Sequence, residues 1–168
     1  DADFNVSAPG CKIEAVNIVE NLRIQAIEPH FNAQSGLDAE GAALFAHHRD
    51  LIWFYQLAIA RQKARGKYEP ERAAQYDYSI ELASDGLVSV ARRERGSPID
   101  TLVSEMMILA NSTWAQMLDQ AGLPGLFRVQ PAGKVRMSTQ SEPHIGMGVQ
   151  HYGWFTSPLR RAADYINQ

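Results

Sequence analysis

The chain has 168 residues, of which 45% are apolar and 21% charged, and its formal net charge is −3. These values are typical of a globular protein, and the length fits a single domain, 1–168. They exclude a chain that is basic over its whole surface, so any site for a polyanion has to be a local basic patch.

The single cysteine, Cys11, excludes an internal disulfide and a cysteine-based zinc cluster, and it fits a reducing compartment. No stretch approaches the roughly 20 apolar residues of a membrane span and no secretory signal opens the chain, so we expect a cytoplasmic protein without a membrane partner.

The N-terminal third predicts one strand and two helices. Residues 11–19 alternate in part and could form a strand, and residues 21–31 predict a short helix that Pro29 breaks. Residues 37–65 are the longest helical candidate, because apolar side chains recur there at helical spacing. Gly66 is well placed to end that helix.

A hairpin and a second long helix follow. Residues 76–82 and 87–91 alternate around Asp85-Gly86, a turn-forming pair, and so predict a β-hairpin. Ser97 can cap a helix over residues 99–121, whose wide apolar stripe predicts burial on much of its surface. Residues 123–149 then predict loops with short strands at 127–129 and 134–137. The fold class is therefore α+β, with two long packing helices.

The run Y-G-W-F-T-S-P-L-R-R, residues 152–161, carries the clearest chemical signal. Thr156 and Ser157 are typical N-cap residues, and proline is typical of the first helical position, so the run predicts the start of a C-terminal helix at Pro158. The free N–H groups and positive dipole of such a start form an anion site. Arg160 and Arg161 in its first turn could grip phosphate oxygens, and the aromatic side chains before it could stack on bases. A capped surface helix with solvated arginines is the alternative.

Three runs, in the same order, resemble the ribonuclease II/R (RNB) family. L-V-S-E-M-M-I-L-A-N at 102–111 is similar to its V-E-E-x-M-x-x-A-N helix, P-H-I-G-M-G at 143–148 to its P-H-x-G-L-G segment, and F-T-S-P-L-R-R at 155–161 to its T-S-P-I-R-R/K run. The resemblance implies part of the catalytic domain of a metal-dependent 3′→5′ exoribonuclease, which hydrolyses single-stranded RNA to nucleoside 5′-monophosphates. It also implies Mg²⁺ held by aspartates N-terminal to the matched runs.

By position in these runs, Arg160 is the candidate catalytic residue, placed at the scissile phosphate. The other candidates for contact with RNA or its phosphates are Ser157, Arg161, Thr156, Tyr152, His144 and Glu105. Most of them have a structural alternative: helix capping for the hydroxyl residues, a backbone hydrogen bond for His144, and a surface position for Glu105 and Arg161.

No metal ligand is assigned in this chain, because Asp1 and Asp3 do not match the family's spaced cluster. Since the chain begins with Asp1 rather than Met and its last helix has no stop signal, we expect a fragment of a longer protein; a processed or trimmed chain is the alternative. Because the metal-binding aspartates of the family are missing, we expect this fragment to be inactive alone. Expected partners are single-stranded RNA, the missing N-terminal part of the domain, and another copy through exposed apolar helix faces.

Ser104 and Ala162 depart from the family pattern, which usually has a glutamate and an aromatic residue there. They favour an alternative reading as a catalytically inactive RNB-like module that binds RNA or protein. A stand-alone α+β interaction domain is the third reading.

Overall fold

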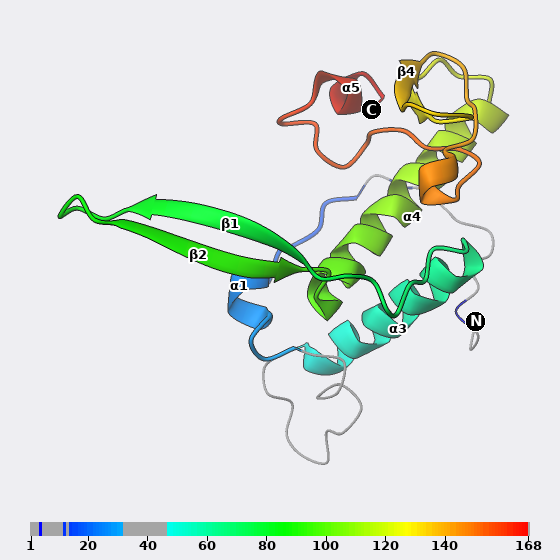
Figure 1. Ribbon diagram of the computed structural model, residues 1–168. Helices are drawn as coiled ribbons and strands as arrows, with labels where there is room; N and C mark the ends of the chain where they lie inside the picture. The colour runs from blue at the N-terminus through cyan, green and yellow to red at the C-terminus, as the bar shows by residue number, and fades with distance from the viewer. Residues whose placement is uncertain (1–3, 5–11, 13, 32–46, 168) are drawn as a thin grey trace. The chain divides into compact units, whose positions relative to one another are not determined.

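A computed structural model describes residues 4, 12, 14–31 and 47–167 of the chain (Figure 1). The described residues form two compact units. One contains residues 4, 12, 14–16, 56–68 and 103–167 and is called the C-terminal unit. The other contains residues 17–31, 47–55 and 69–102 and is called the hairpin unit. No helix among the described residues is long and apolar enough to cross a membrane.

The first long helix, α3, runs over His48–Ala64. The predicted helix over 37–65 is thus confirmed from His48 onward, while residues 37–46 lie outside the described part of the chain. Gly66 ends the helix as predicted, with a left-handed φ of 64° that favours glycine. The amide of Lys67 donates to the carbonyl of Gln62 at 2.9 Å, which satisfies one of the last free carbonyls of the helix.

The N-terminal expectations are borne out only in part. Residues 14–19, the continuously described part of the predicted strand, are exposed and form no strand. The physical reason is that alternating apolar and polar residues stabilise a strand only where a neighbouring strand or a core covers the apolar face. The short helix predicted over 21–31 is present as a single turn, α1 (Ile24–Ile27), before Pro29.

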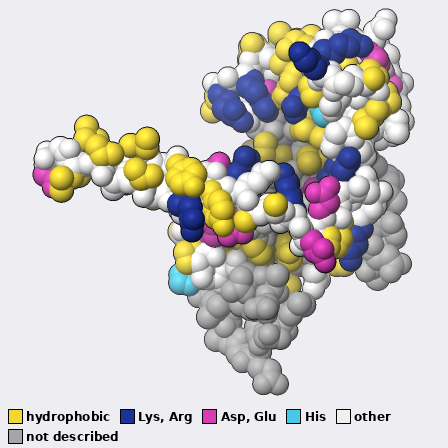
Figure 2. Space-filling view, in the orientation of Figure 1, with side chains coloured by type: hydrophobic (Ala, Val, Ile, Leu, Met, Phe, Trp, Pro, Cys, Tyr) yellow, Lys and Arg dark blue, Asp and Glu magenta, His cyan; other side chains and the backbone are white. Residues whose placement is uncertain are grey.

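The predicted hairpin is confirmed as β1 (Gln75–Leu82) and β2 (Val88–Arg95), paired antiparallel from Gln75↔Arg95 to Leu82↔Val88. Gly86 takes a φ of 81° in the connecting turn. Tyr78, Ile80 and Val90 share one face of this two-stranded sheet and are 65%, 74% and 63% exposed. Figure 2 shows hydrophobic side chains along the hairpin.

The second long helix, α4 (Pro98–Gln120), confirms the prediction for 99–121. Its cap is also confirmed, because the amide of Asp100 donates to the Ser97 hydroxyl at 3.3 Å. Further along, the helix supplies Trp114, Ala115 and Leu118 to the core of the C-terminal unit. The other members of that core are Phe127, Val129 and Phe155.

Short strands and turns complete the C-terminal unit, as predicted. β3 (Phe127–Val129) pairs antiparallel with β4 (Arg136–Ser138), and the 3-10 turn η1 (Ile145–Met147) follows. The single bridge between Phe127 and Gly153 brings the 152–161 run against β3. The mixed α+β fold class is therefore confirmed.

The last helix begins later than Pro158. Helix α5 covers only Ala162–Ile166, and Arg161 stands at its N-cap position with no side-chain capping bond. Residues 158–160 form a turn instead. The predicted capping roles of Thr156 and Ser157, and the helix-dipole anion site, are therefore wrong. The reason is tertiary, because the Ser157 amide donates to the Asp164 carboxylate at 2.8 Å rather than opening a helix.

Candidate functional site

Arg160 lies at the end of an exposed turn, next to Leu159, which is fully exposed. The amides of Arg160 and Arg161 both donate to the carbonyl of Ser157, at 3.2 Å each, which closes the turn. Among the described residues, nothing forms a hydrogen bond or ion pair with the Arg160 guanidinium. A cation that has no internal partner and faces solvent is available to an anionic ligand.

Arg161, by contrast, is engaged inside the unit. Its Nε lies 2.6 Å and its terminal nitrogen 2.7 Å from the two carboxylate oxygens of Asp164, whose side chain is fully buried. Burial by itself would raise the pKa of Asp164, but the hydrogen bonds and charge of Arg161 and the Ser157 amide outweigh it and lower that pKa. The surface alternative for Arg161 is therefore wrong.

Asn111 holds the aromatic half of the same run. Its side-chain oxygen accepts the Phe155 amide at 3.0 Å. Its side-chain nitrogen donates to the Tyr152 hydroxyl at 3.3 Å and to the Thr156 hydroxyl at 3.4 Å. Asn111 is itself buried, so one side chain of α4 fixes three positions of the run that leads into the turn. Tyr152 is buried too, which turns its ring away from any ligand that stacks at the surface.

His144 is buried beside this run, with its ring edge-on to Tyr152 at a centroid distance of 5.8 Å. Its Nδ1 accepts the Met147 amide at 3.3 Å, so the backbone-bonded alternative from the sequence is confirmed. Burial, and then the positive charge of Arg128, lower the pKa of His144 and favour the neutral ring.

Glu105 is buried as well, and the surface alternative for it is wrong. It forms an ion pair with Arg65, and the side chains of the two residues are only 4% and 7% exposed. Arg65 also donates to the carbonyl of Met147. The pair thus ties the end of α3, the middle of α4 and the η1 turn together.

All the predicted site residues thus belong to the C-terminal unit. Among them, Arg160 alone presents a charge to solvent that has no partner in the described part of the chain. Sequence reasoning missed Arg65, Asn111 and Asp164, the partners that organise them. Asp164 could have been found from its spacing, since residues three apart on a helix are neighbours. Asn111 ends the 102–111 run, whereas no local pattern points to Arg65.

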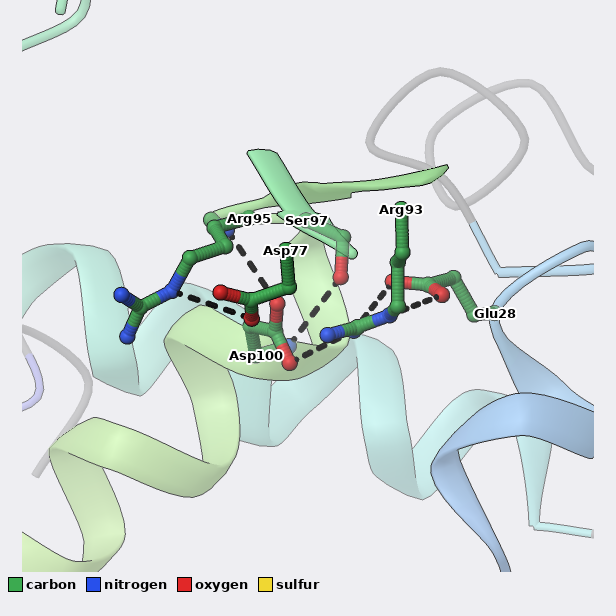
Figure 3. Close-up of polar contacts among 7 residues, drawn as sticks. Glu28, Asp77, Arg93, Arg95, Ser97 and Asp100 are labelled. Carbon is green, nitrogen blue, oxygen red and sulfur yellow. Dashed lines mark hydrogen bonds and ion pairs between the residues drawn. The ribbon is translucent and has the colours of Figure 1, made fainter. Parts of the chain in front are cut away.

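The arginines at the outgoing end of the hairpin are also occupied. Figure 3 shows Arg93 between two carboxylates: it donates to Glu28 at 2.6 and 2.7 Å and to Asp100 at 2.7 Å. The hydrogen bond from Arg93 is the main cause that lowers the pKa of Glu28. Arg92 lies 4.5 Å from the centre of the Tyr76 ring. The Arg93 contacts fasten the base of the hairpin to the C-terminal end of α1 and to α4, whereas the Arg92 contact lies within the hairpin.

The described residues also bear on a metal site. Within 14–31, 47–167 and the two isolated described positions, no group of three or more His, Cys, Asp or Glu side chains could hold a metal ion. The described residues therefore do not fit the Mg²⁺ that the resemblance implies.

The model of the RNB domain family matches residues 21–136, well over half of the chain. The chain therefore belongs to the RNB domain family, which confirms the resemblance seen in its sequence. The matched range contains the 102–111 run but ends before His144 and the 152–161 run. The roles of the residues in those two runs stay predictions.

Individual relatives agree with this assignment. Exoribonuclease 2 of Glaesserella parasuis is 26% identical over 183 aligned positions, which cover 71% of this chain and 28% of that protein. The Dss1 exoribonuclease of Candida glabrata has a similar fold, with a TM-score of 0.59, 20% identity, and coverage of 79% of this chain and 22% of that one. RNase R of Mycoplasma genitalium, in complex with double-stranded RNA, has a TM-score of 0.62, 16% identity, and coverage of 80% and 34%. The chain thus spans less than a third of the length of the curated relative.

Proposed function

We propose that this chain is the arginine-bearing part of a 3′→5′ exoribonuclease that degrades single-stranded RNA to nucleoside 5′-monophosphates, with Arg160 at the scissile phosphate. The observation that carries the proposal is the exposed guanidinium of Arg160, which has no partner among the described residues and lies on a turn held at both ends. The RNB family membership and the RNA complex of a protein with a similar fold support RNA as the molecule that carries this phosphate.

The proposed task of Arg160 is electrostatic. A guanidinium can donate two parallel hydrogen bonds to phosphoryl oxygens and stays charged at any working pH. Where it is aimed at oxygens that gain negative charge during hydrolysis, it stabilises the transition state more than the ground state. Asn111 and Asp164 do not contact RNA in this proposal; they fix the backbone on either side of the turn.

The proposal includes dependence on Mg²⁺ and the inability of the 168-residue chain to hydrolyse RNA by itself. Both follow from the family resemblance, in which aspartates N-terminal to the matched runs would hold the Mg²⁺ and the bound metal would supply Lewis-acid chemistry for hydrolysis. We expect the chain to bind a single-stranded RNA oligonucleotide with or without Mg²⁺ and to leave it intact in both cases. Shortening of the RNA by the pure chain in Mg²⁺ would refute the expectation of inactivity.

The binding half of the proposal is tested with Arg160→Gln. The affinity for a single-stranded RNA oligonucleotide is measured by fluorescence anisotropy at several salt concentrations. Loss of one phosphate contact is expected to reduce the slope of log affinity against log salt by about 0.7. Lys134→Gln is the matched control, because Lys134 is exposed in the same unit and forms no ion pair with the described residues. Equal slopes for wild type and Arg160→Gln would refute the role of Arg160.

One observation favours the alternative of an inactive RNA-binding module. Ser104 is exposed, next to the buried Glu105. A glutamate at this position, as the family usually has, would be accessible to a ligand, whereas the serine carries no charge. Ser104→Glu is the test in the parent protein. If it raises turnover of RNA from an undetectable level, the serine is the cause of inactivity, whereas measurable turnover by the unaltered parent would exclude the inactive module.

A further inference from the structure

The two neighbouring arginines of the 152–161 run occupy opposite environments. Arg160 is exposed and has no partner among the described residues, whereas the Arg161 side chain is 29% exposed and spans both oxygens of Asp164. Adjacent residues on an extended segment or turn point in different directions, so the same turn sends one guanidinium outward and the other inward.

Asp164 connects the two ends of the turn. Its Oδ1 accepts the Ser157 amide at 2.8 Å, at the start of the turn, and the Arg161 guanidinium at 2.7 Å, at its end. The carbonyl of Ser157 accepts the amides of Arg160 and Arg161. Because Asp164 is fully buried, its charge needs both donors, and the turn cannot open without exposing or stranding that charge.

From this geometry we infer that Arg161 is a positioning residue rather than a phosphate ligand. Together with Asp164 it forms a clamp that fixes the Ser157–Arg161 turn, so that Arg160 alone faces the RNA phosphate. The inference rests on the proposed function for its RNA part. It assigns different tasks to two basic residues that the sequence presents as equivalent.

The alternative is that Arg161 binds a neighbouring phosphate. To do so, its guanidinium would have to leave Asp164, and a fully buried carboxylate would lose its charged partner. A phosphate and Asp164 could share the guanidinium only through Nη1, the nitrogen that the contacts with Asp164 do not use. The clamp requires neither change.

The RNA part is tested with a neutral pair, Arg161→Gln together with Asp164→Asn. This pair removes both charges at once and keeps an acceptor for the Ser157 amide, so the turn is expected to survive. With single-stranded RNA as the probe, we expect the salt slope of the pair to equal that of wild type and the affinity to stay within about threefold. Arg160→Gln should reduce the slope by about 0.7 in the same assay. A reduction of that size in the neutral pair would overturn the inference, because it would count Arg161 as a phosphate contact.

The clamp itself is tested without RNA, so that its failure can be told from failure of the proposed function. In Asp164→Ala, NMR hydrogen exchange of the Ser157 amide is expected to accelerate about tenfold or more, because the amide loses its acceptor. In the neutral pair that amide should stay protected. An unchanged exchange rate in Asp164→Ala would overturn the clamp. If the wild-type chain binds no RNA, the proposed function and the phosphate role of Arg160 fail together, while the exchange measurement still decides the clamp.

Discussion

Removal of the Glu105 carboxylate tests the buried ion pair at the centre of the C-terminal unit. In Glu105→Ala, the Arg65 guanidinium would stay in a place where its side chain is only 7% exposed, with the Met147 carbonyl as its remaining acceptor among the described residues. An uncompensated buried charge of this kind typically costs about 3–5 kcal/mol. That is a large part of the roughly 5–15 kcal/mol by which domains are stable.

The control removes both charges. In Arg65→Met combined with Glu105→Leu, no buried charge is stranded, and the Met147 carbonyl loses one hydrogen bond, worth about 1 kcal/mol. We therefore expect the double variant to be more stable than Glu105→Ala, although it carries one more substitution.

Urea unfolding followed by circular dichroism measures both variants, with the midpoint giving the change and a constant slope confirming that two states are compared. A loss of less than about 1 kcal/mol in Glu105→Ala would refute the reasoning, because an accessible pair costs that little. A double variant less stable than Glu105→Ala would refute it as well.

Three further predictions concern other contacts. Arg93→Ala is expected to lower the free energy of unfolding by about 1–2 kcal/mol, a value discounted for the partial exposure of the cluster, and to raise the pKa of Glu28, measurable by NMR titration. Because burial lowers the pKa of His144, its contribution to stability should be fully present above about pH 6.5, the ordinary value, and decline as pH falls below it. His144→Gln should remove that part of the pH dependence in urea titrations at pH 5–8, and an identical pH profile would contradict it. Ile80→Thr should change stability by less than about 0.5 kcal/mol, because the side chain is 74% exposed; a loss above about 2 kcal/mol would show that the hairpin face is covered in solution.

Much of the backbone could be predicted from local patterns. Asp85-Gly86 between alternating segments predicts the hairpin, because the turn and the period of two are encoded within a few residues. Ser97 at the start of α4 and Gly66 after α3 have the same local character. The strand expected over residues 11–19 fails in its described part, since a strand needs a partner that its own sequence does not supply.

For the candidate site, too, some features follow from local sequence patterns and others from tertiary contacts. The amino-acid sequence by itself singled out the candidate residues, including Arg160, because the 152–161 run and the order of the three runs are visible without coordinates. It did not determine which arginine is free. That was decided by Asp164, whose buried carboxylate binds Arg161 and whose position depends on how α5 packs against the 152–161 run. A capping pattern reflects only hydrogen bonds between residues that are close in the sequence. In the structure, the buried Asp164 carboxylate needs the Ser157 amide and the Arg161 guanidinium as donors, and this requirement outweighs the predicted cap.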